Sequence, residues 1–332
     1  DEIEQIWQMS MVNGSWRNGP VLNNAISGID QALWDIKGKR ANMPVYQLLG
    51  GKCREGASVY THTGGRDPLE VEDSVRKAMA EGYRCVRVAL WGQGHHLPKP
   101  ENAPPGGYWD AKASMLSTLK MLEHLRASIG FEIDLVYDVH ERYAPQDAVA
   151  FAKEVEPYKL YFLEDPLAPE DLGWFKNIRQ QSATPIGMGE LFTTPHEWLP
   201  LVKAREVDFL RMHISMMGGL TPARNVAAYA NMHGVRTAWH GPRDITPSGH
   251  AANLHLDLWA PNFGVQECYP IPDEYREIFP GTPEIRNGYM YTNEQPGLGV
   301  DIDEYLAAKY PCEIAAKPNN VPRAPDGAPI RP

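Results

Sequence analysis

Apolar runs alternate with amphipathic stretches along most of the chain, and many of the apolar runs lead into a polar or acidic residue. Three such runs follow one another at intervals of 26 residues: IDLVYDVHER with Asp138, LYFLEDP with Glu164, and PIGMGEL with Glu190. One strand, its covering helix and two short loops take roughly 25 residues, so this period predicts consecutive βα units of a parallel sheet. We therefore expect the three carboxylates to meet at one edge of that sheet.

The same pattern continues on both sides of these runs. Two earlier strands are expected at ASVYTHT and RCVRVAL, and three later ones follow at intervals of 23, 27 and 27 residues: VDFLRMHI ending near His213, VRTAWH at His240, and FGVQE at Glu267. Helical periodicity is expected over IEQIWQM, over PVYQLLGG, and over residues 21–39, where Ile26, Ile29, Leu33 and Ile36 form an apolar stripe. Eight strands that alternate with helices favour a (β/α)₈ barrel over an open doubly wound sheet, and no GxGxxG follows the first strand.

Composition and charge narrow the class of protein. The chain has 332 residues, of which 43% are hydrophobic and 22% charged, which is typical of a globular protein. A net charge of −10 without a dense basic cluster argues against a nucleic-acid partner. Four scattered cysteines, no membrane-length apolar run and an acidic first segment predict a soluble cytoplasmic protein that does not bind membranes.

Three carboxylates at one sheet edge would repel one another unless a cation lies between them. A site made of carboxylate oxygens suits Mg²⁺ better than Zn²⁺, because Zn²⁺ prefers His and Cys. In a barrel, the polar residues at the carboxyl ends of the strands form the active site. The residues alone therefore predict a Mg²⁺ site at Asp138, Glu164 and Glu190.

Eight segments, in chain order, carry a resemblance to a known family: AISGIDQALWDIKGK, PVYQLLGG, YDVHER, FLEDP, GELF, ISMMGGLTPAR, WHGPRDITPSGHAANLHLD and VQE. In sequence and in order they resemble the enolase superfamily, and within it the mannonate dehydratase and starvation-sensing group of sugar-acid dehydratases. The resemblance implies a modified (β/α)₇β barrel with a capping domain built from both termini. We expect cap helices at residues 1–56, the barrel at 57–268, and a C-terminal segment that returns to the cap at 269–332. Members of the group usually begin with a further antiparallel segment, so the N-terminal part of the cap is expected to be incomplete.

The resemblance also assigns roles to single residues. It matches Asp138, Glu164 and Glu190 to the Mg²⁺ ligands and His140 to the acid on the third strand. His140 lies two residues beyond Asp138, which predicts the same strand face. The other matches are Arg87 on the second strand, His240 on the seventh, and Glu267 on the eighth.

The base and the substrate contacts are less completely matched. Related dehydratases pair the Arg with a Tyr from the following loop as the base, and here Tyr108 is a distant candidate for that Tyr. We read His240 as a contact to the substrate or the enolate, Arg87 as a partner of a substrate or protein carboxylate, and Glu267 as a possible acceptor of substrate hydroxyls.

The function expected on these grounds is Mg²⁺-dependent dehydration of an aldonic acid, D-mannonate or D-gluconate, to a 2-keto-3-deoxy acid through an enediolate. The partner is then a small sugar acid, and the group's habit suggests a homo-oligomer. Two alternatives stay open. In the first, the chain is a weakly active or inactive relative with a metabolite-binding or regulatory role. In the second, it is a racemase or epimerase of 2-hydroxy acids. The second alternative is weakened because the second strand reads Arg87, Val88, Ala89 and lacks the Lys-x-Lys that other superfamily members carry.

Overall fold

The computed structural model describes residues 2–91, 101–104, 106–243, 245–311 and 321–331. The chain folds into two compact units. The first contains Asp1–Thr61 and Gly187–Pro311, and the second contains His62–Ile186 and Cys312–Pro332. No helix in the part of the chain that the structure describes is long and apolar enough to cross a membrane.

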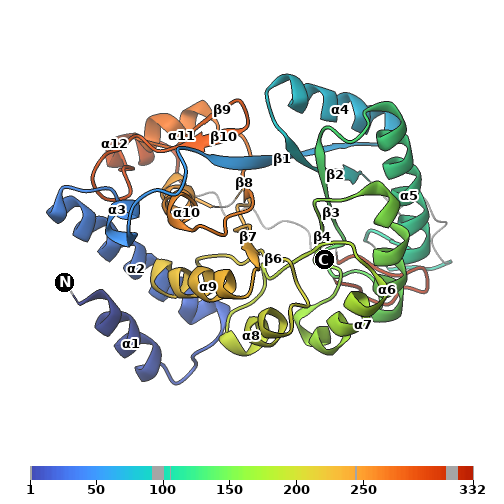
Figure 1. Cartoon of the computed structure of the whole chain (residues 1–332), viewed down its shortest axis with the longest axis horizontal. Helices are drawn as coiled ribbons and strands as arrows, with labels where there is room; N and C mark the ends of the chain where they lie inside the picture. Colours follow the sequence, from blue (N-terminus) through green and yellow to red (C-terminus); the bar gives the residue numbers. More distant parts are fainter. Residues whose placement is uncertain (1, 92–100, 105, 244, 312–320, 332) are drawn as a thin grey trace. The chain divides into compact units, whose positions relative to one another are not determined.

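The second unit is a parallel α/β layer. Its sheet has the order β1-β2-β3-β4, with β2 parallel to β3 and β3 parallel to β4. Helices α4 and α5 pack against β2 and lie outside the strands in Figure 1. The elements are β1 (Ala57–Gly65), which begins in the first unit, α4 (Pro68–Ala80), β2 (Cys85–Leu90), α5 (Ala111–Ser128), β3 (Asp134–Asp138), α6 (Pro145–Glu154), η1 (Glu156–Tyr158), β4 (Phe162–Glu164), η2 (Pro169–Trp174) and α7 (Phe175–Gln181).

The first unit contains a second parallel group of strands. β6 pairs in parallel with both β5 and β7, and β8 pairs in parallel with the beginning of β1. Its strands are β5 (Ile186–Met188), which begins at the last residue of the second unit's main segment, β6 (Phe209–Leu210), β7 (Arg236–Thr237), β8 (Gln266–Glu267), β9 (Glu284–Arg286) and β10 (Tyr289–Tyr291). Its helices are α1 (Ile3–Asn13), α2 (Pro20–Ala41), α3 (Val45–Leu49), α8 (Pro195–Ala204), α9 (Leu220–Met232), α10 (Pro247–Trp259), α11 (Asp273–Ile278) and α12 (Glu304–Ala307).

All eight expected strands are present, but three end earlier than expected. β5, β6 and β7 stop two to three residues before Glu190, His213 and His240 respectively. The backbone beyond them still follows its neighbours through single hydrogen bonds, from Arg211 N to Met188 O and from His240 N to Met212 O. Gly189, with a φ of 131°, ends the ladder after β5 because this conformation is left-handed. The polar residues therefore lie in the turns that follow the strands.

The buried face of α2 differs from the apolar stripe expected for residues 21–39. Ile29 and Ile36 are 58% and 52% exposed, while Asn23, Ser27 and Asp30 are buried beside Ile26 and Trp34. The reason is hydrogen bonding, because the Asn23 amide donates to Thr193 O and Met216 O, and Asp30 accepts from the backbone and side chain of Thr221. These partners satisfy the Asn23 N–H groups and the Asp30 carboxylate. The helix is therefore held by polar contacts as well as by apolar packing.

A short hairpin that the apolar pattern did not predict follows the barrel strands. β9 and β10 pair antiparallel across Asn287 and Gly288, which both have positive φ, as a two-residue hairpin turn requires. β10 then pairs antiparallel with the start of β1. Farther on, Arg323 forms an isolated bridge with Tyr108 and exchanges backbone hydrogen bonds with Gly107 and Trp109.

Candidate active site

Two of the three predicted ligands lie side by side in the second unit. Asp138 at the end of β3 pairs in register with Glu164 at the end of β4. Ligand atoms of Asp138, Glu164 and the following residue, Asp165, lie within 4.8 Å of one another. Glu164 and Asp165 are almost completely buried. Negative charges this close together in a buried place are unfavourable unless they are protonated or shared by a cation. Carboxylate oxygens are the ligands that Mg²⁺ prefers, so this donor set fits that ion.

The turns after β3 and β4 give this acidic triad its shape. His140, Glu141 and Asp165 all have positive φ, at 54°, 61° and 37°, which is uncommon for residues other than glycine. Hydrogen bonds hold both turns, from Glu141 N to Asp165 O and from His140 N to Asp138 Oδ1. Successive side chains of a strand point to opposite faces, but the left-handed Asp165 breaks this alternation and brings its carboxylate to that of Glu164. Backbone conformations of this kind cluster at functional sites.

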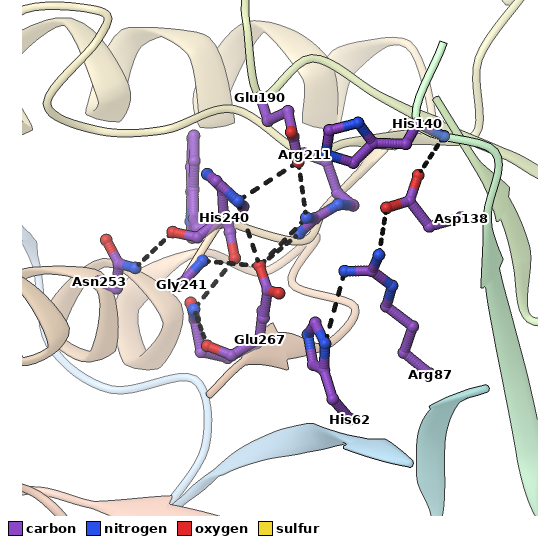
Figure 2. Close-up of polar contacts among 12 residues, drawn as sticks. His62, Arg87, Asp138, His140, Glu190, Arg211, His240, Gly241, Asn253 and Glu267 are labelled. Carbon is purple, nitrogen blue, oxygen red and sulfur yellow. Dashed lines mark hydrogen bonds and ion pairs between the residues drawn. The ribbon is translucent and has the colours of Figure 1, made fainter. Parts of the chain in front are cut away.

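Arg87 and His140 meet Asp138 in one cavity of about 140 Å³. The Arg87 guanidinium forms an ion pair of 2.5 Å with Asp138 Oδ2, and its other terminal nitrogen lies 3.5 Å from His62 Nδ1 (Figure 2). His140 lies in the turn after β3 and not on the strand, so its place in the cavity comes from its positive φ and not from strand alternation. The cavity therefore joins a carboxylate, a guanidinium and an imidazole.

Tyr108 and the loop before it bear on the identity of the base. Tyr108 is buried, and its hydroxyl donates to Pro104 O at 3.2 Å. Among the described residues, those that line the cavity include its neighbour Trp109 but not Tyr108. Residues 92–100 of this loop lie outside the described residues. Arg87 therefore stays a predicted member of the general base. The structure gives no geometric support for Tyr108 in that role.

The other predicted site residues gather in the first unit. Arg211 is fully buried, and its guanidinium lies 3.3 Å from Glu190 Oε2 and 3.1 Å from Glu267 Oε2 (Figure 2). His240 Nε2 lies 3.3 Å from the same Glu190 oxygen and 3.7 Å from Glu267 Oε2. Two carboxylates face one guanidinium, so the group keeps a net negative charge unless the imidazole is protonated. Such a group attracts cations and hydrogen-bond donors.

The exit from β7 is tightly packed against Glu267. Gly241 N donates to Glu267 Oε2 at 2.9 Å, and a Cβ atom on Gly241 would lie 2.0 Å from Glu267 O. The His240 carbonyl accepts from the Asn253 amide at 3.2 Å (Figure 2). Glycine at position 241 is therefore required for this close approach, and the backbone of His240 is held on both sides.

Three residues of these groups were not predicted from the sequence. Asp165 sits beside Glu164 in FLEDP, where strand alternation points it away from the site. Arg211 is a charged residue inside the apolar run VDFLRMHI, and this signal could have identified it, because a buried guanidinium needs carboxylate partners. His62 lies within β1, and its contact with Arg87 depends on how β1 and β2 pair.

The comparisons with known proteins identify the family of the chain. The model of the enolase C-terminal domain-like family matches residues 70–306, and that of the mandelate racemase/muconate lactonizing enzyme N-terminal domain matches residues 1–50. The chain belongs to the enolase superfamily. A D-galactonate dehydratase family member from Salmonella enteritidis PT4 is 51% identical over 99% of the chain and 84% of its own length, and one from Enterocloster bolteae is 48% identical over 99% and 83%. The expectation of a sugar-acid dehydratase, a lyase, is confirmed by this membership.

Solved structures place the fold in the same superfamily. An enolase from Pantoea ananatis with bound D-gluconate and Mg has a TM-score of 0.96 and 51% identity, covering all of this chain and 85% of its own. A mandelate racemase/muconate lactonizing enzyme from Jannaschia sp. CCS1 has a TM-score of 0.83 and 26% identity, covering 95% and 81%. The expected fold class, a modified TIM-type barrel of the (β/α)₇β kind with a capping domain, is confirmed.

Proposed function

We propose that this enolase superfamily member is a Mg²⁺-dependent dehydratase of hexonic acids, with D-gluconate as the first candidate substrate. The observation that carries the proposal is the buried triad of Asp138, Glu164 and Asp165 next to the Arg87 and His140 cavity. D-gluconate comes first because the Pantoea ananatis relative, at 51% identity, binds it together with Mg. D-mannonate and D-galactonate follow as the other candidates.

The overall reaction removes water from C2 and C3 of the acid. A base takes the C2 proton, the bond between C3 and its hydroxyl oxygen breaks with a proton from an acid, and the resulting enol becomes the 2-keto-3-deoxy product. When bound, Mg²⁺ supplies the positive charge that makes the C2 proton acidic by drawing electrons from the substrate carboxylate. Asp138 and Glu164 would hold the ion, and Glu190 stays the predicted third ligand from the sequence period.

The chain's own residues divide the remaining tasks. His140 shares its cavity with Asp138 and is the acid that gives a proton to the departing hydroxyl. Arg87, paired with Asp138, holds that carboxylate in place and is the predicted partner of a substrate carboxylate. In the first unit, His240 is the predicted contact to the substrate or the enolate and Glu267 the predicted acceptor of sugar hydroxyls, and the buried Arg211 holds the Glu267 carboxylate in place.

One observation favours a second candidate function, in which the protein binds sugar acids but turns them over slowly or not at all. The Tyr108 hydroxyl bonds to Pro104 O instead of lining the cavity with Arg87. If no other residue fills the role of the base, ligand binding survives without turnover. We therefore expect low activity on D-mannonate in particular.

The test is incubation of the protein with Mg²⁺ and a panel of hexonates, followed by detection of 2-keto-3-deoxy acids and of epimerised substrate by NMR. Formation of the keto product from at least one hexonate supports the dehydratase, provided that Glu164→Gln abolishes it. Binding of D-gluconate by calorimetry without any product favours the second function. Epimerised substrate without keto product would overturn both and indicate a racemase or epimerase.

A further inference from the structure

His213 follows β6 and packs directly on the ring of His240. Their ring centroids lie 5.2 Å apart at an interplanar angle of 71°, which is an edge-to-face contact. Ser215 N donates to His213 Nδ1 at 3.2 Å. This hydrogen bond fixes the orientation of the His213 ring, and in the neutral ring it puts the proton on Nε2. His213 is therefore an anchored ring that His240 contacts.

Further contacts hold the backbone of His240 and the Nε2 end of its ring. Its N–H donates to Met212 O at 3.0 Å, and its carbonyl accepts from Asn253. Nε2 lies close to the carboxylates of Glu190 and Glu267. These contacts place the Cα atom and the far end of the ring, while His213 supplies a ring contact that restricts how the imidazole tilts.

Beyond His213 lies a polar cavity of about 510 Å³ in the same unit. His213 and Ser215 line it from one side, Ser248 from the start of α10, and Asn24 and Gln31 from α2. Among the described residues, those that line the cavity include His213 but not His240. A cavity of this size with polar walls accommodates water. Removing the His213 ring would extend the cavity towards His240 and leave space into which that imidazole could turn.

We propose that His213 is a positioning residue that keeps the His240 imidazole turned towards Glu190 and Glu267 and away from the polar cavity. The positioning of the His240 ring by His213 does not depend on the proposed function. Only the expected effect of His213 on turnover rests on that function. A displacement of about 1 Å at a reacting group can cost on the order of 10²-fold in rate. The contact between two rings is thus sufficient to matter for catalysis without His213 touching the substrate.

The kinetic test compares three variants in the Mg²⁺-loaded full chain with the hexonate that the wild type converts. His213→Ala should lower kcat by roughly 10- to 100-fold, with KM changed much less, because the ring moves while the other contacts remain. Added imidazole should restore part of the kcat of His213→Ala by occupying the vacated space. His213→Phe, which keeps an aromatic ring there, should retain most of the activity. Ser248→Ala, which alters the same cavity away from His240, is the matched control and should behave as the wild type. Wild-type kcat in His213→Ala would overturn the proposal.

A spectroscopic test does not depend on turnover and so separates this proposal from the proposed function. In substrate-free protein labelled at the histidine rings, the His240 resonance is identified by its loss in His240→Gln. We expect it to shift or broaden in His213→Ala and to stay in place in Ser248→Ala. If the wild type converts no hexonate but this shift occurs, the positioning role stands and the proposed function fails. An unmoved His240 resonance in His213→Ala overturns the positioning role, whatever the activity.

Discussion

Neutralising Glu164 is the most informative single change, because this carboxylate is completely buried and lies close to two others. At an effective dielectric constant of about 20, two unit charges 4.8 Å apart repel by roughly 3.5 kcal/mol. Glu164→Gln removes two of the three repulsive pairs of the triad, so at this separation, with all three groups ionised, the relief is about 7 kcal/mol. The ion pair of Arg87 with Asp138 already offsets part of this repulsion, and a buried amide requires its own hydrogen bonds. We therefore expect the metal-free variant to be more stable than the metal-free wild type by about 1–3 kcal/mol.

The same substitution removes a ligand and should have the opposite effect when Mg²⁺ is present. An ion at 100 times its dissociation constant stabilises a protein by about 2.7 kcal/mol, which corresponds to several degrees in Tm. The wild type should show this rise, and Glu164→Gln should lose most of it. The two stability curves are therefore expected to cross as Mg²⁺ is added.

The assay is thermal unfolding followed by circular dichroism, after treatment with a chelator and dialysis, in a series of Mg²⁺ concentrations. Glu132→Gln is the matched control, because Glu132 is an exposed acidic residue just before β3. That variant should follow the wild type throughout. A Mg²⁺-induced rise in Glu164→Gln equal to that of the wild type would refute the triad as the metal site. A lower Tm of the metal-free variant would contradict strong repulsion among the three carboxylates but would leave the metal site in place.

Four further predictions concern single residues. His140→Asn should lower the rate of dehydration by roughly 10²- to 10⁴-fold, while exchange of the C2 proton for deuterium continues, as measured by NMR in D₂O. Loss of both dehydration and exchange, with Mg²⁺ still bound, would make His140 part of the base. Glu190→Gln should weaken the Mg²⁺-induced rise in Tm if Glu190 is the third ligand, and an unchanged rise together with unchanged activity would exclude it. Burial raises the pKa of the Asp257 carboxyl well above its usual range, so the folded state holds this proton more tightly and stability falls as pH rises above about 4. Asp257→Asn should reduce that fall in Tm between pH 5 and 8. An unchanged dependence of Tm on pH would contradict a neutral Asp257 carboxyl. Burial lowers the pKa of His255 to about 4, so the contribution of this neutral ring to stability is lost as pH falls from about 6.5 towards 4. His255→Gln should show a smaller drop in Tm between pH 6.5 and 4.5 than the wild type. An equal drop in both proteins would count against a neutral buried ring.

The positions of several strands could be predicted because a parallel strand that is buried on both faces reads as an apolar run, as Ile186–Met188 and Phe209–Leu210 do. The regular interval from Asp138 to Glu164 to Glu190 identified equivalent βα units, and the pairing of Asp138 with Glu164 in adjacent parallel strands agrees with it. Strand ends were less accurate, because the backbone beyond β5, β6 and β7 leaves the ladder while it keeps single hydrogen bonds to its neighbours.

The face of a helix that is buried also depends on its partners. In α2, periodicity assigned Ile29 and Ile36 to the interior, yet the buried positions include Asn23 and Asp30. A polar side chain can be buried wherever tertiary structure supplies its hydrogen bonds, and those partners come from Thr193, Met216 and Thr221, far away in the sequence. Hydrophobic periodicity carries no information about such partners.

The sequence by itself determined the order of the βα units, the family, and the residues at the strand ends that are candidates for chemistry. Only the tertiary structure decided which of these side chains meet. Asp165 joins Glu164 because its backbone is left-handed, Arg211 lies between Glu190 and Glu267 because three strand ends converge, and His213 meets His240 across neighbouring turns. Spacing along the chain fixes which residues follow a strand, but the direction of a side chain after the strand is set by turn dihedrals and by packing, which are properties of the folded chain.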